Sequence, residues 1–391
     1  MEKNLRQGRP LRLPITPKGG INLTTVYFPS WHIASDPRCG VDSLPWDRLD
    51  TVHHAFWKVS PRDGGYALES LDPRADTDPA NPAAHFPLYE KYLQKYPRVR
   101  VLLSVGGWTD SGCFSEMSLT KESRASFICS CLEVLDRYAF LSGLDLDWEY
   151  PGVERRPGGG NGAGNPVRGD DRANYTLLLK ELREVLDAHF GPGAKALTVC
   201  AGASVSGALC KQDYAALHPF VDRVNLMTYD LAGAWDPFTG HQAALFGTVS
   251  ADTAVQYLRS LGVPPEKIAI GSPWYSHSWR LDAPAENPVG APAGPAQELP
   301  WHALRVLEKS AVPRGVPGWH TGYDEKAAAA WLWNDDPASP DYLTFHSWES
   351  AASLQAKLDY IRREHLGGLI VWEIHGDSRE ENWPLLTLAA P

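Results

Sequence analysis

Eight short apolar runs recur along the 391-residue chain, separated by helix-like segments and loops. Strands that alternate with helices build a parallel sheet, and eight such strands close most naturally into a (β/α)8 barrel, or TIM barrel, of the α/β class. The length suits one such barrel with an insertion. The eight expected strands are residues 21–28, 51–59, 99–107, 141–149, 196–203, 221–229, 267–274 and 367–375.

An open, doubly wound parallel sheet is the alternative architecture. Such a sheet normally carries a glycine-rich phosphate-binding loop after its first strand, but the sequence VYFPSWH at 26–32 contains no glycine. The glycine-rich run 158–166 lacks the G-x-G-x-x-G spacing and is not followed by Lys-Ser or Lys-Thr, so we interpret it as a loop. The clearest helix is expected over residues 170–190, where leucines recur at helical spacing.

One connection departs from this regular alternation. From Tyr275 to about residue 345 the chain runs far beyond the usual βα connection of about 2–6 residues. This segment begins Pro-rich and becomes helix-like from Trp301 to Lys309. We therefore expect an N-terminal arm (1–20), a barrel (21–275 and 346–391) and a small α+β insertion (276–345) between strand seven and its helix.

Composition and charge argue against several classes of function. The formal net charge of −10 and the pI near 5.7 disfavour nucleic acid as a partner, because its binding depends on clustered Lys and Arg. No run of residues approaches the length of a membrane span. No H-E-x-x-H or other metal-ligand spacing is present, so we expect no metal and no cofactor. Fifteen Trp and fifteen Tyr exceed the usual needs of a core, and flat aromatic faces suit sugar rings.

The fourth expected strand carries an unusual pattern, GLDLDWEYP at 143–151. Successive side chains of a strand point to opposite faces, so Asp145, Asp147 and Glu149 share one face and the apolar residues between them share the other. The apolar face must contact helices if the strand is central, which leaves the acids facing the barrel interior. Glu149 would then lie at the C-terminal mouth, where barrel enzymes place their active sites.

Carboxyl groups buried at this spacing cannot all ionise without a large cost in free energy. Two charges ~5 Å apart at an effective dielectric of ~20 repel by roughly 3 kcal/mol, or about two pKa units. We therefore expect a raised pKa for Glu149, so that it keeps a proton near neutral pH as a general acid must. A solvated surface strand and a calcium site are the plainer interpretations. The apolar opposite face weighs against the first, and the absence of EF-hand spacing weighs against the second.

The acidic strand and several other segments of the chain resemble the motifs of the family 18 glycoside hydrolases, the chitinase family. SGLDLDWE at 142–149 is similar to the D-G-x-D-x-D-x-E strand of that family. The segments that resemble its third, sixth, seventh and eighth strands, in order, are SVGGW (104–108), NLMTYDLAGAWDPFTGH (225–241), IGSPWY (270–275) and GGLIVWE (367–373). The resemblance covers nearly the whole chain after the arm, and it implies a (β/α)8 barrel with an α+β insertion after strand seven.

The resemblance also implies a role for each matching residue. Glu149 matches the acid that protonates the leaving oxygen, Asp147 matches the carboxylate that orients the substrate's 2-acetamido group, and Asp145 matches the acid that shares a proton with Asp147. In that family the acetamido oxygen attacks the sugar in place of an enzyme carboxylate, with retained anomeric configuration. The other implied substrate contacts are Tyr229 at the acetamido group, Met227 and Asp230 beside it, Trp372 beneath the sugar, the platforms Trp108 and Trp235, and the cleft aromatics Tyr27, Phe56 and Tyr275.

Some positions leave this assignment open or depart from it. Tyr27 and Phe56 are equally compatible with the barrel core. Ser142 stands where the family has its first Asp, which removes a charge at the base of the acidic strand. The sequence Tyr275-Ser276-His277 replaces the family's Tyr-Gly-Arg, which puts one subsite contact in doubt.

The implied activity is retaining, substrate-assisted hydrolysis of β-1,4-linked N-acetylglucosamine polymers, namely chitin and its oligosaccharides. Two alternatives remain: an endo-β-N-acetylglucosaminidase acting on glycoprotein glycans, and a non-catalytic chitinase-like lectin, which would usually lack the residue matching Glu149. We expect a monomer, with assembly into a larger complex left open. No secretory segment is visible near the N-terminus, so the place of action stays open between the cytoplasm and extracellular action by a non-standard export route.

Overall fold

The computed structural model of the chain describes residues 23–156, 164–312 and 315–390. The expected N-terminal arm (1–20) and most of the expected glycine-rich loop (158–166) lie outside these residues. Eight parallel strands form a ring, and pairing of the first strand with both the second and the last closes it. They are β1 (Leu23–Pro29), β2 (Thr51–Arg62), β4 (Arg100–Gly106), β5 (Leu141–Asp147), β6 (Ala196–Gly202), β7 (Arg223–Met227), β8 (Ile268–Pro273) and β14 (Gly368–Trp372). The expected (β/α)8 barrel is confirmed, and the open doubly wound sheet is not what forms.

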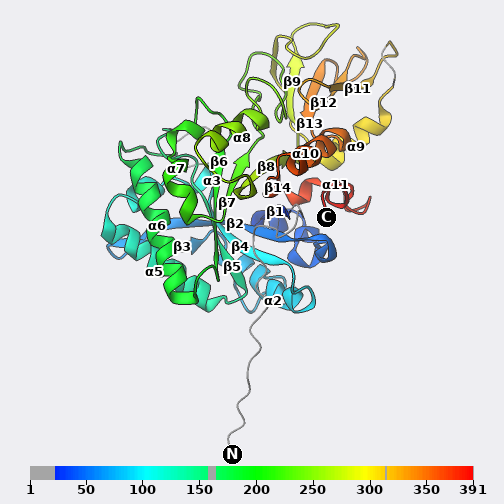
Figure 1. The fold of residues 1–391 in the computed structure, drawn as a ribbon. Helices are drawn as coiled ribbons and strands as arrows, with labels where there is room; N and C mark the ends of the chain where they lie inside the picture. The colour runs from blue at the N-terminus through cyan, green and yellow to red at the C-terminus, as the bar shows by residue number, and fades with distance from the viewer. Residues whose placement is uncertain (1–22, 157–163, 313–314, 391) are drawn as a thin grey trace, which may run out of the picture.

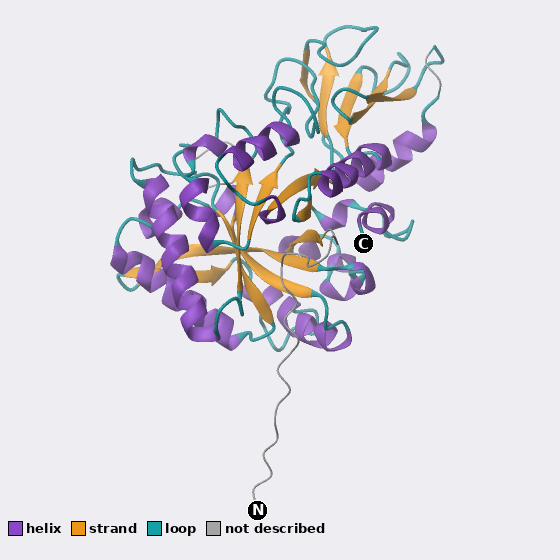
Figure 2. Cartoon of the chain, viewed as in Figure 1, coloured by secondary structure: helices purple, strands orange, loops and turns teal. Residues whose placement is uncertain are grey.

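Helices surround the ring, as Figures 1 and 2 show. The strand β5 is followed by α6 (Asp171–Phe190), which matches the helix expected over 170–190. The helix α5 (Lys121–Arg137) begins with a capping box, in which the Thr120 hydroxyl accepts from the Ser123 backbone and the Ser123 hydroxyl bonds back to Thr120. The other helices of the barrel are α1 (Pro73–Asp76), α2 (His85–Lys95), α3 (Gly107–Asp110), α4 (Phe114–Met117), α7 (Tyr214–Leu217), α8 (Ala251–Ser260), α10 (Ala351–Arg363) and α11 (Pro384–Ala389).

The apolar face of β5 packs outward against this helical layer. Leu144 and Leu146 have no exposed surface, and Trp148 is almost fully buried. The Trp148 ring stacks on Phe114, with centroids 5.4 Å apart, and its indole nitrogen donates to the side chain of Asn165 at 2.9 Å. Because side chains alternate along the strand, this packing directs Asp145 and Asp147 to the inside of the ring.

A second, antiparallel sheet is inserted after β8. Its strand order is β10–β9–β13–β12–β11, and the helix α9 (Trp301–Ser310) lies within the same segment. In Figure 1 the sheet lies at the upper right, on the far side of the molecule from α5. Its last strand runs to Trp348 and so crosses the boundary expected at residue 345. The strands are β9 (His277–Leu281), β10 (Ala293–Pro295), β11 (Trp319–Asp324), β12 (Ala329–Asn334) and β13 (Thr344–Trp348).

The sequence did not predict β3 (Gly65–Ser70), which pairs antiparallel with the end of β2. The two strands are joined at Asp63 and Gly64, with φ of 42° and 82°. Positive φ at both positions is typical of the tight turns that favour Asp-Gly, so this dipeptide was the available signal. Among the described residues, no helix has the length and apolar content needed to cross a membrane.

Candidate active site

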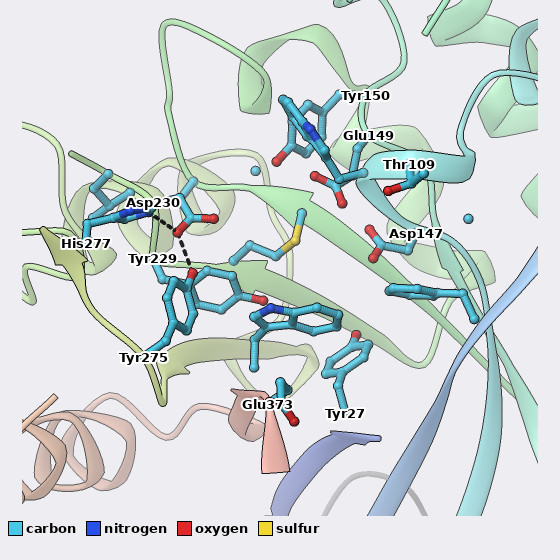
Figure 3. A pocket seen from close by; sticks show the side chains of 18 of the residues that line it. Tyr27, Thr109, Asp147, Glu149, Tyr150, Tyr229, Asp230, Tyr275, His277 and Glu373 are labelled. Atoms are coloured by element: carbon cyan, nitrogen blue, oxygen red, sulfur yellow. Dashed lines mark hydrogen bonds and ion pairs between the residues drawn. The ribbon is translucent and has the colours of Figure 1, made fainter. Parts of the chain in front are cut away.

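A cavity of about 1370 Å³ opens at the C-terminal ends of the barrel strands. Figure 3 shows Asp147 and Glu149 on one side of it and Tyr229, Asp230 and Tyr275 on the other. Every site residue expected from the sequence lines this cavity except Asp145, which lies deeper in the barrel. The remaining expected residues along the lining are Tyr27, Phe56, Trp108, Met227, Trp235 and Trp372.

Glu149 lies immediately beyond β5 and is only 8% exposed. Its backbone nitrogen donates to the Ser111 hydroxyl at 2.9 Å, and the same hydroxyl lies 3.3 Å from the Asp147 carbonyl. Burial is the main reason that the pKa of Glu149 is raised to about 7, and the charge of Asp230 adds to it against a hydrogen bond from Tyr150. A carboxyl group with this pKa holds a proton near neutral pH and can act as a general acid.

Asp147 lies two residues deeper and is 3% exposed. Burial raises the pKa of Asp147 well above its ordinary value, and the charges of Glu149 and Asp145 raise it further. Its Oδ1 atom is buried and has no hydrogen-bond partner among the residues that the structure describes. Because Asp147 lines the cavity, a donor on a ligand bound against it would supply the partner that this oxygen lacks.

Asp145 is fully buried, and both of its carboxylate oxygens accept hydrogen bonds. The donors are the hydroxyls of Tyr27 (3.0 Å), Ser104 (2.8 Å) and Thr198 (2.5 Å) and the amide of Asn225 (3.0 Å). Strand register explains two of these contacts, because Ser104 and Thr198 are the residues paired with Asp145 on the neighbouring strands.

The environment of Asp145 favours its charged form. Burial by itself would raise the pKa of Asp145, but His53, 3.2 Å away, together with the hydroxyl donors lowers it below its ordinary value. Within the described residues, no hydrogen bond joins Asp145 to Asp147. Asp145 therefore supplies a fixed negative charge beneath Asp147, and the sharing of a proton between the two acids stays a prediction.

The opposite wall is built from β7, β8 and the loops that follow them. Tyr229 is 7% exposed and packs on Gly271, where a Cβ atom would come within 2.6 Å of the tyrosine ring. A side chain at position 271 would therefore push Tyr229 into the cavity. Asp230 follows with a left-handed backbone (φ 56°), and its carboxylate accepts a hydrogen bond from the Tyr275 hydroxyl.

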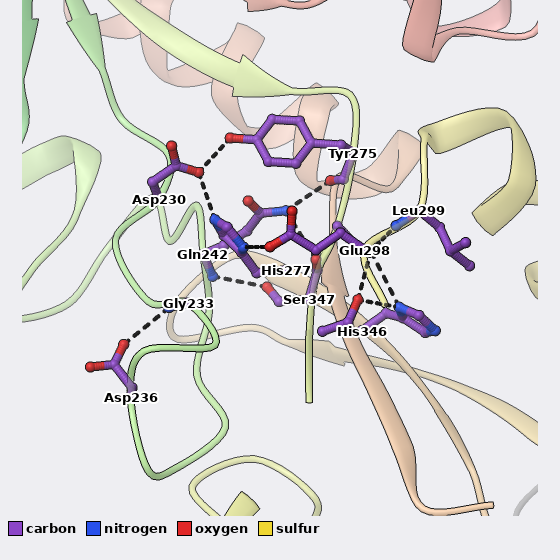
Figure 4. Close-up of polar contacts among 12 residues, drawn as sticks. Asp230, Gly233, Asp236, Gln242, Tyr275, His277, Glu298, Leu299, His346 and Ser347 are labelled. Atoms are coloured by element: carbon purple, nitrogen blue, oxygen red, sulfur yellow. Dashed lines mark hydrogen bonds and ion pairs between the residues drawn. The ribbon is translucent and has the colours of Figure 1, made fainter. Parts of the chain in front are cut away.

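His277 links this wall to the insertion (Figure 4). Its Nε2 lies 2.7 Å from Oδ1 of Asp230, and its Nδ1 contacts the carboxylate of Glu298, which belongs to the insertion. Burial alone would lower the pKa of His277, but the two carboxylates outweigh burial and raise it to about 9. An imidazolium therefore joins two anions here, at the position where the family pattern has an arginine.

Aromatic side chains cover much of the remaining cavity wall. Trp372 stacks on Phe56 with ring centroids 5.7 Å apart, and Phe56 in turn faces Trp31 at 6.2 Å. Trp108 and Trp235 are 53% and 64% exposed, although Trp side chains are highly buried on average, and the Arg155 guanidinium lies 4.1 Å from the centroid of the Trp108 ring. Stacked and exposed indoles in one cavity suit a ligand with flat apolar faces, such as a sugar.

Several residues of the site were not predicted from the sequence. Trp31, Tyr150 and Glu298 line the cavity, His53 and Ser111 support the acidic strand, and His277 was treated only as a departure from a motif. Trp31 follows the first strand directly, as active-site residues of barrels do, so its position was a usable signal. Tyr150 directly follows Glu149, so its position was a signal as well. The contacts of the others depend on segments that are distant in the sequence, which no local pattern encodes.

Comparison with known proteins places the chain in a family. The family model for glycosyl hydrolases family 18 matches residues 23–377. Chitinase A of Pseudoalteromonas piscicida and Chitinase A1 of Niallia circulans are each 33% identical, over 73% of this chain. The chain spans 38% and 42% of the length of these two relatives.

A solved structure agrees with the sequence comparison. The Group IV chitinase of Ostrinia furnacalis in complex with allosamidin superposes with a TM-score of 0.79 at 27% identity. The superposition covers 94% of this chain and 97% of that one. The barrel, the order of its motifs and the matched residues lead to one conclusion: the chain belongs to the glycosyl hydrolases of family 18.

Proposed function

We propose that the protein hydrolyses β-1,4-linked N-acetylglucosamine polymers, chitin and chitooligosaccharides, with retention of anomeric configuration. Glu149 protonates the leaving oxygen and later accepts a proton from water. Asp147 holds the substrate's acetamido group, whose oxygen attacks the anomeric carbon from within the substrate. Tyr229 donates a hydrogen bond to the same acetamido group.

The observation that carries this proposal is the pair of buried acids at the head of β5. Glu149 has a pKa raised to about 7, which suits proton donation, and Asp147, which lines the same cavity, has a buried oxygen without a partner among the described residues. An amide N–H of the substrate is the donor that this oxygen lacks. Holding an internal nucleophile in a reactive orientation can lower a barrier by roughly 7–11 kcal/mol, so orienting groups can replace a nucleophilic carboxylate.

The first test compares variants on a chitin tetramer. Glu149→Gln and Asp147→Asn are each expected to lower kcat by at least about 100-fold, because general acid–base catalysis alone contributes about 10²–10⁴-fold. Glu184→Gln, at an exposed glutamate on α6, is the matched control and should keep the parent rate. A Glu149→Gln variant that hydrolyses the tetramer at the parent rate would refute the proposed role.

A second measurement identifies which group attacks the anomeric carbon. Proton NMR of the first products should show the β-anomer, and oligomers without the 2-acetamido group should not be cleaved. An enzyme carboxylate acting as nucleophile would cleave both substrates with retention, and an inverting mechanism would give the α-anomer.

Two alternative functions share the same acidic strand. A non-catalytic lectin has no use for a buried acid with a pKa near neutrality, so Glu149 favours the enzyme. An endo-β-N-acetylglucosaminidase would release glycans from a high-mannose glycoprotein. We expect no such release, and turnover of the glycoprotein in preference to chitin oligomers would favour that alternative.

A further inference from the structure

We propose that His32, Glu373 and His375 form a binding site for a divalent transition metal ion such as Zn²⁺, at the C-terminal mouth of the barrel. His32 lies in the turn after β1, and the other two residues follow β14 directly. Neighbouring strands β1 and β14 thus bring the three side chains together, although 340 residues lie between His32 and Glu373 in the chain. This inference does not depend on the proposed glycosidase activity.

The distances between the candidate ligand atoms suit a small ion. Nε2 of His32 lies 3.5 Å from Oε1 of Glu373, and Nδ1 of His375 lies 3.0 Å from Oε2 of the same carboxylate. One ligand atom from each of the three residues lies within 4.8 Å of the others. Two ligands that each sit 2.0–2.1 Å from a tetrahedral Zn²⁺ are about 3.4 Å apart, so small side-chain adjustments would complete the geometry.

The buried member of the cluster is incompletely hydrogen-bonded. The side chain of His375 is 4% exposed, and its Nδ1 contacts only the Glu373 carboxylate, without a hydrogen bond of good geometry among the described residues. A buried polar nitrogen without a well-aligned partner is costly, and a metal ion bound at Nδ1 would offset that cost at this nitrogen. The backbone N–H of His375 donates to Oε2 of Glu373 at 2.7 Å and so fixes the carboxylate in place.

The types of ligand indicate the class of ion. Imidazole nitrogens favour Zn²⁺, Cu²⁺ and Ni²⁺ over Mg²⁺ and Ca²⁺, which prefer oxygen ligands. Two histidines and one glutamate are also the ligand set of known three-ligand zinc sites that keep a position open. His32 is 35% exposed and lines the large cavity together with Glu373, so an open position can face solvent and a bound ligand.

A second cluster of similar composition does not qualify. His54, Asp76 and His85 are all fully buried, and one oxygen of Asp76 already accepts from Trp57 and Ser70. His54 and His85 both contact the other oxygen of Asp76, at 3.0 and 3.1 Å. Here four side chains already contact the carboxylate and no solvent reaches it, so the cluster is a structural polar network.

The test uses the full chain without a histidine tag, stripped with a chelator and dialysed. Titration with Zn²⁺ in a calorimeter should give one site with a Kd of about 1 μM or below. His32→Ala and Glu373→Gln should each weaken binding by at least the roughly 10–100-fold that loss of a supporting residue costs. His189→Ala is the matched control, because His189 is exposed and pairs with Asp136 away from this cluster. This variant should bind Zn²⁺ as the parent does.

Cobalt absorption, measured together with circular dichroism, distinguishes loss of the metal site from a folding defect. Co²⁺ added to the stripped parent protein should produce visible d–d absorption bands, and these bands should be lost in Glu373→Gln while its circular dichroism stays unchanged. The proposal is wrong if the parent protein binds no Zn²⁺ at micromolar concentration. It is equally wrong if His32→Ala and Glu373→Gln bind Zn²⁺ as tightly as the parent does.

Discussion

At the scale of single residues, a carboxyl group whose pKa is raised by burial makes the folded state less stable once the pH ionises it. In the unfolded chain Glu149 has its ordinary pKa of 4.5, and in the folded chain its pKa is about 7. Between these values the folded state binds the extra proton. The contribution of Glu149 to the free energy of unfolding therefore falls as the pH rises from about 4.5 to 7, and this loss is complete above pH 7.

Glu149→Gln removes this titration. We expect the Tm of the variant relative to the parent to rise between pH 4.5 and 8, so that the variant becomes the more stable protein at pH 8. Thermal melts of both proteins across this range measure the difference. Glu184→Gln should show no such trend, and a constant Tm difference between Glu149→Gln and the parent would contradict the raised pKa.

The sequence predicted which residues of β5 point inward, because alternation along a strand is a local property. It could not predict the state of each acid. The low pKa of Asp145 depends on His53, Ser104 and Thr198, which reach it from three other strands. The cluster around Glu373 was missed for the same reason, since its histidines match no motif when they are read along the chain.

At the scale of elements, His277 at the start of β9 holds the insertion against the loop after β7. The pKa of His277 is raised from 6.5 to about 9 in the folded chain. A histidine with a raised pKa contributes stability that is fully present below about pH 6.5 and is lost as the pH rises through about 9. The ion pairs with Asp230 and Glu298 should therefore weaken in alkaline solution.

His277→Gln should remove this alkaline step. We expect the Tm of the parent to fall relative to that of the variant between pH 7 and 10, because only the parent has a charge to lose. Hydrogen exchange at the backbone of β9 should accelerate in parallel. His189→Gln, at an exposed histidine, is the control for pH effects that do not depend on His277.

The eight parallel strands were predictable because each is buried on both faces and reads as a short apolar run. The antiparallel strands of the insertion are different. In β11 buried residues mix with half-buried and exposed ones, so no run stands out, whereas β12 (AAWLWN) is almost wholly buried and its apolar run was an available signal. The insertion was predicted from the length of the connection and its α+β class from the family resemblance, whereas the positions of its strands were not predicted.

At the scale of the whole molecule, exposed indoles from separate parts of the chain line one cavity. Trp31 follows β1 and is 46% exposed, and Trp235 follows β7 and is 64% exposed. Each is available to stack on a sugar unit that does not react. Loss of such a contact typically costs about 1–2 kcal/mol, a factor of about 5–30.

Trp31→Ala and Trp235→Ala are each expected to lower kcat/KM for a chitin hexamer by this factor. Cleavage of a trimer should change less, because a short substrate fills fewer positions along the cavity. Val306→Ala, at an exposed apolar residue on α9, is the control. Equal losses on trimer and hexamer would mean that the indoles act on the reacting sugar or on the fold.

The closure of the ring between β1 and β14 has a consequence for biosynthesis. The strand that seals the barrel, β14, is the last of the eight in chain order, so an emerging chain carries an incomplete sheet with two open edges until β14 has been synthesised. Strand pairings between segments that are distant in the sequence form slowly, and unpaired sheet edges can pair with other chains. Nascent chains that stop within the insertion should therefore depend on chaperones, whereas chains that include β14 have no unpaired strand left in their ring.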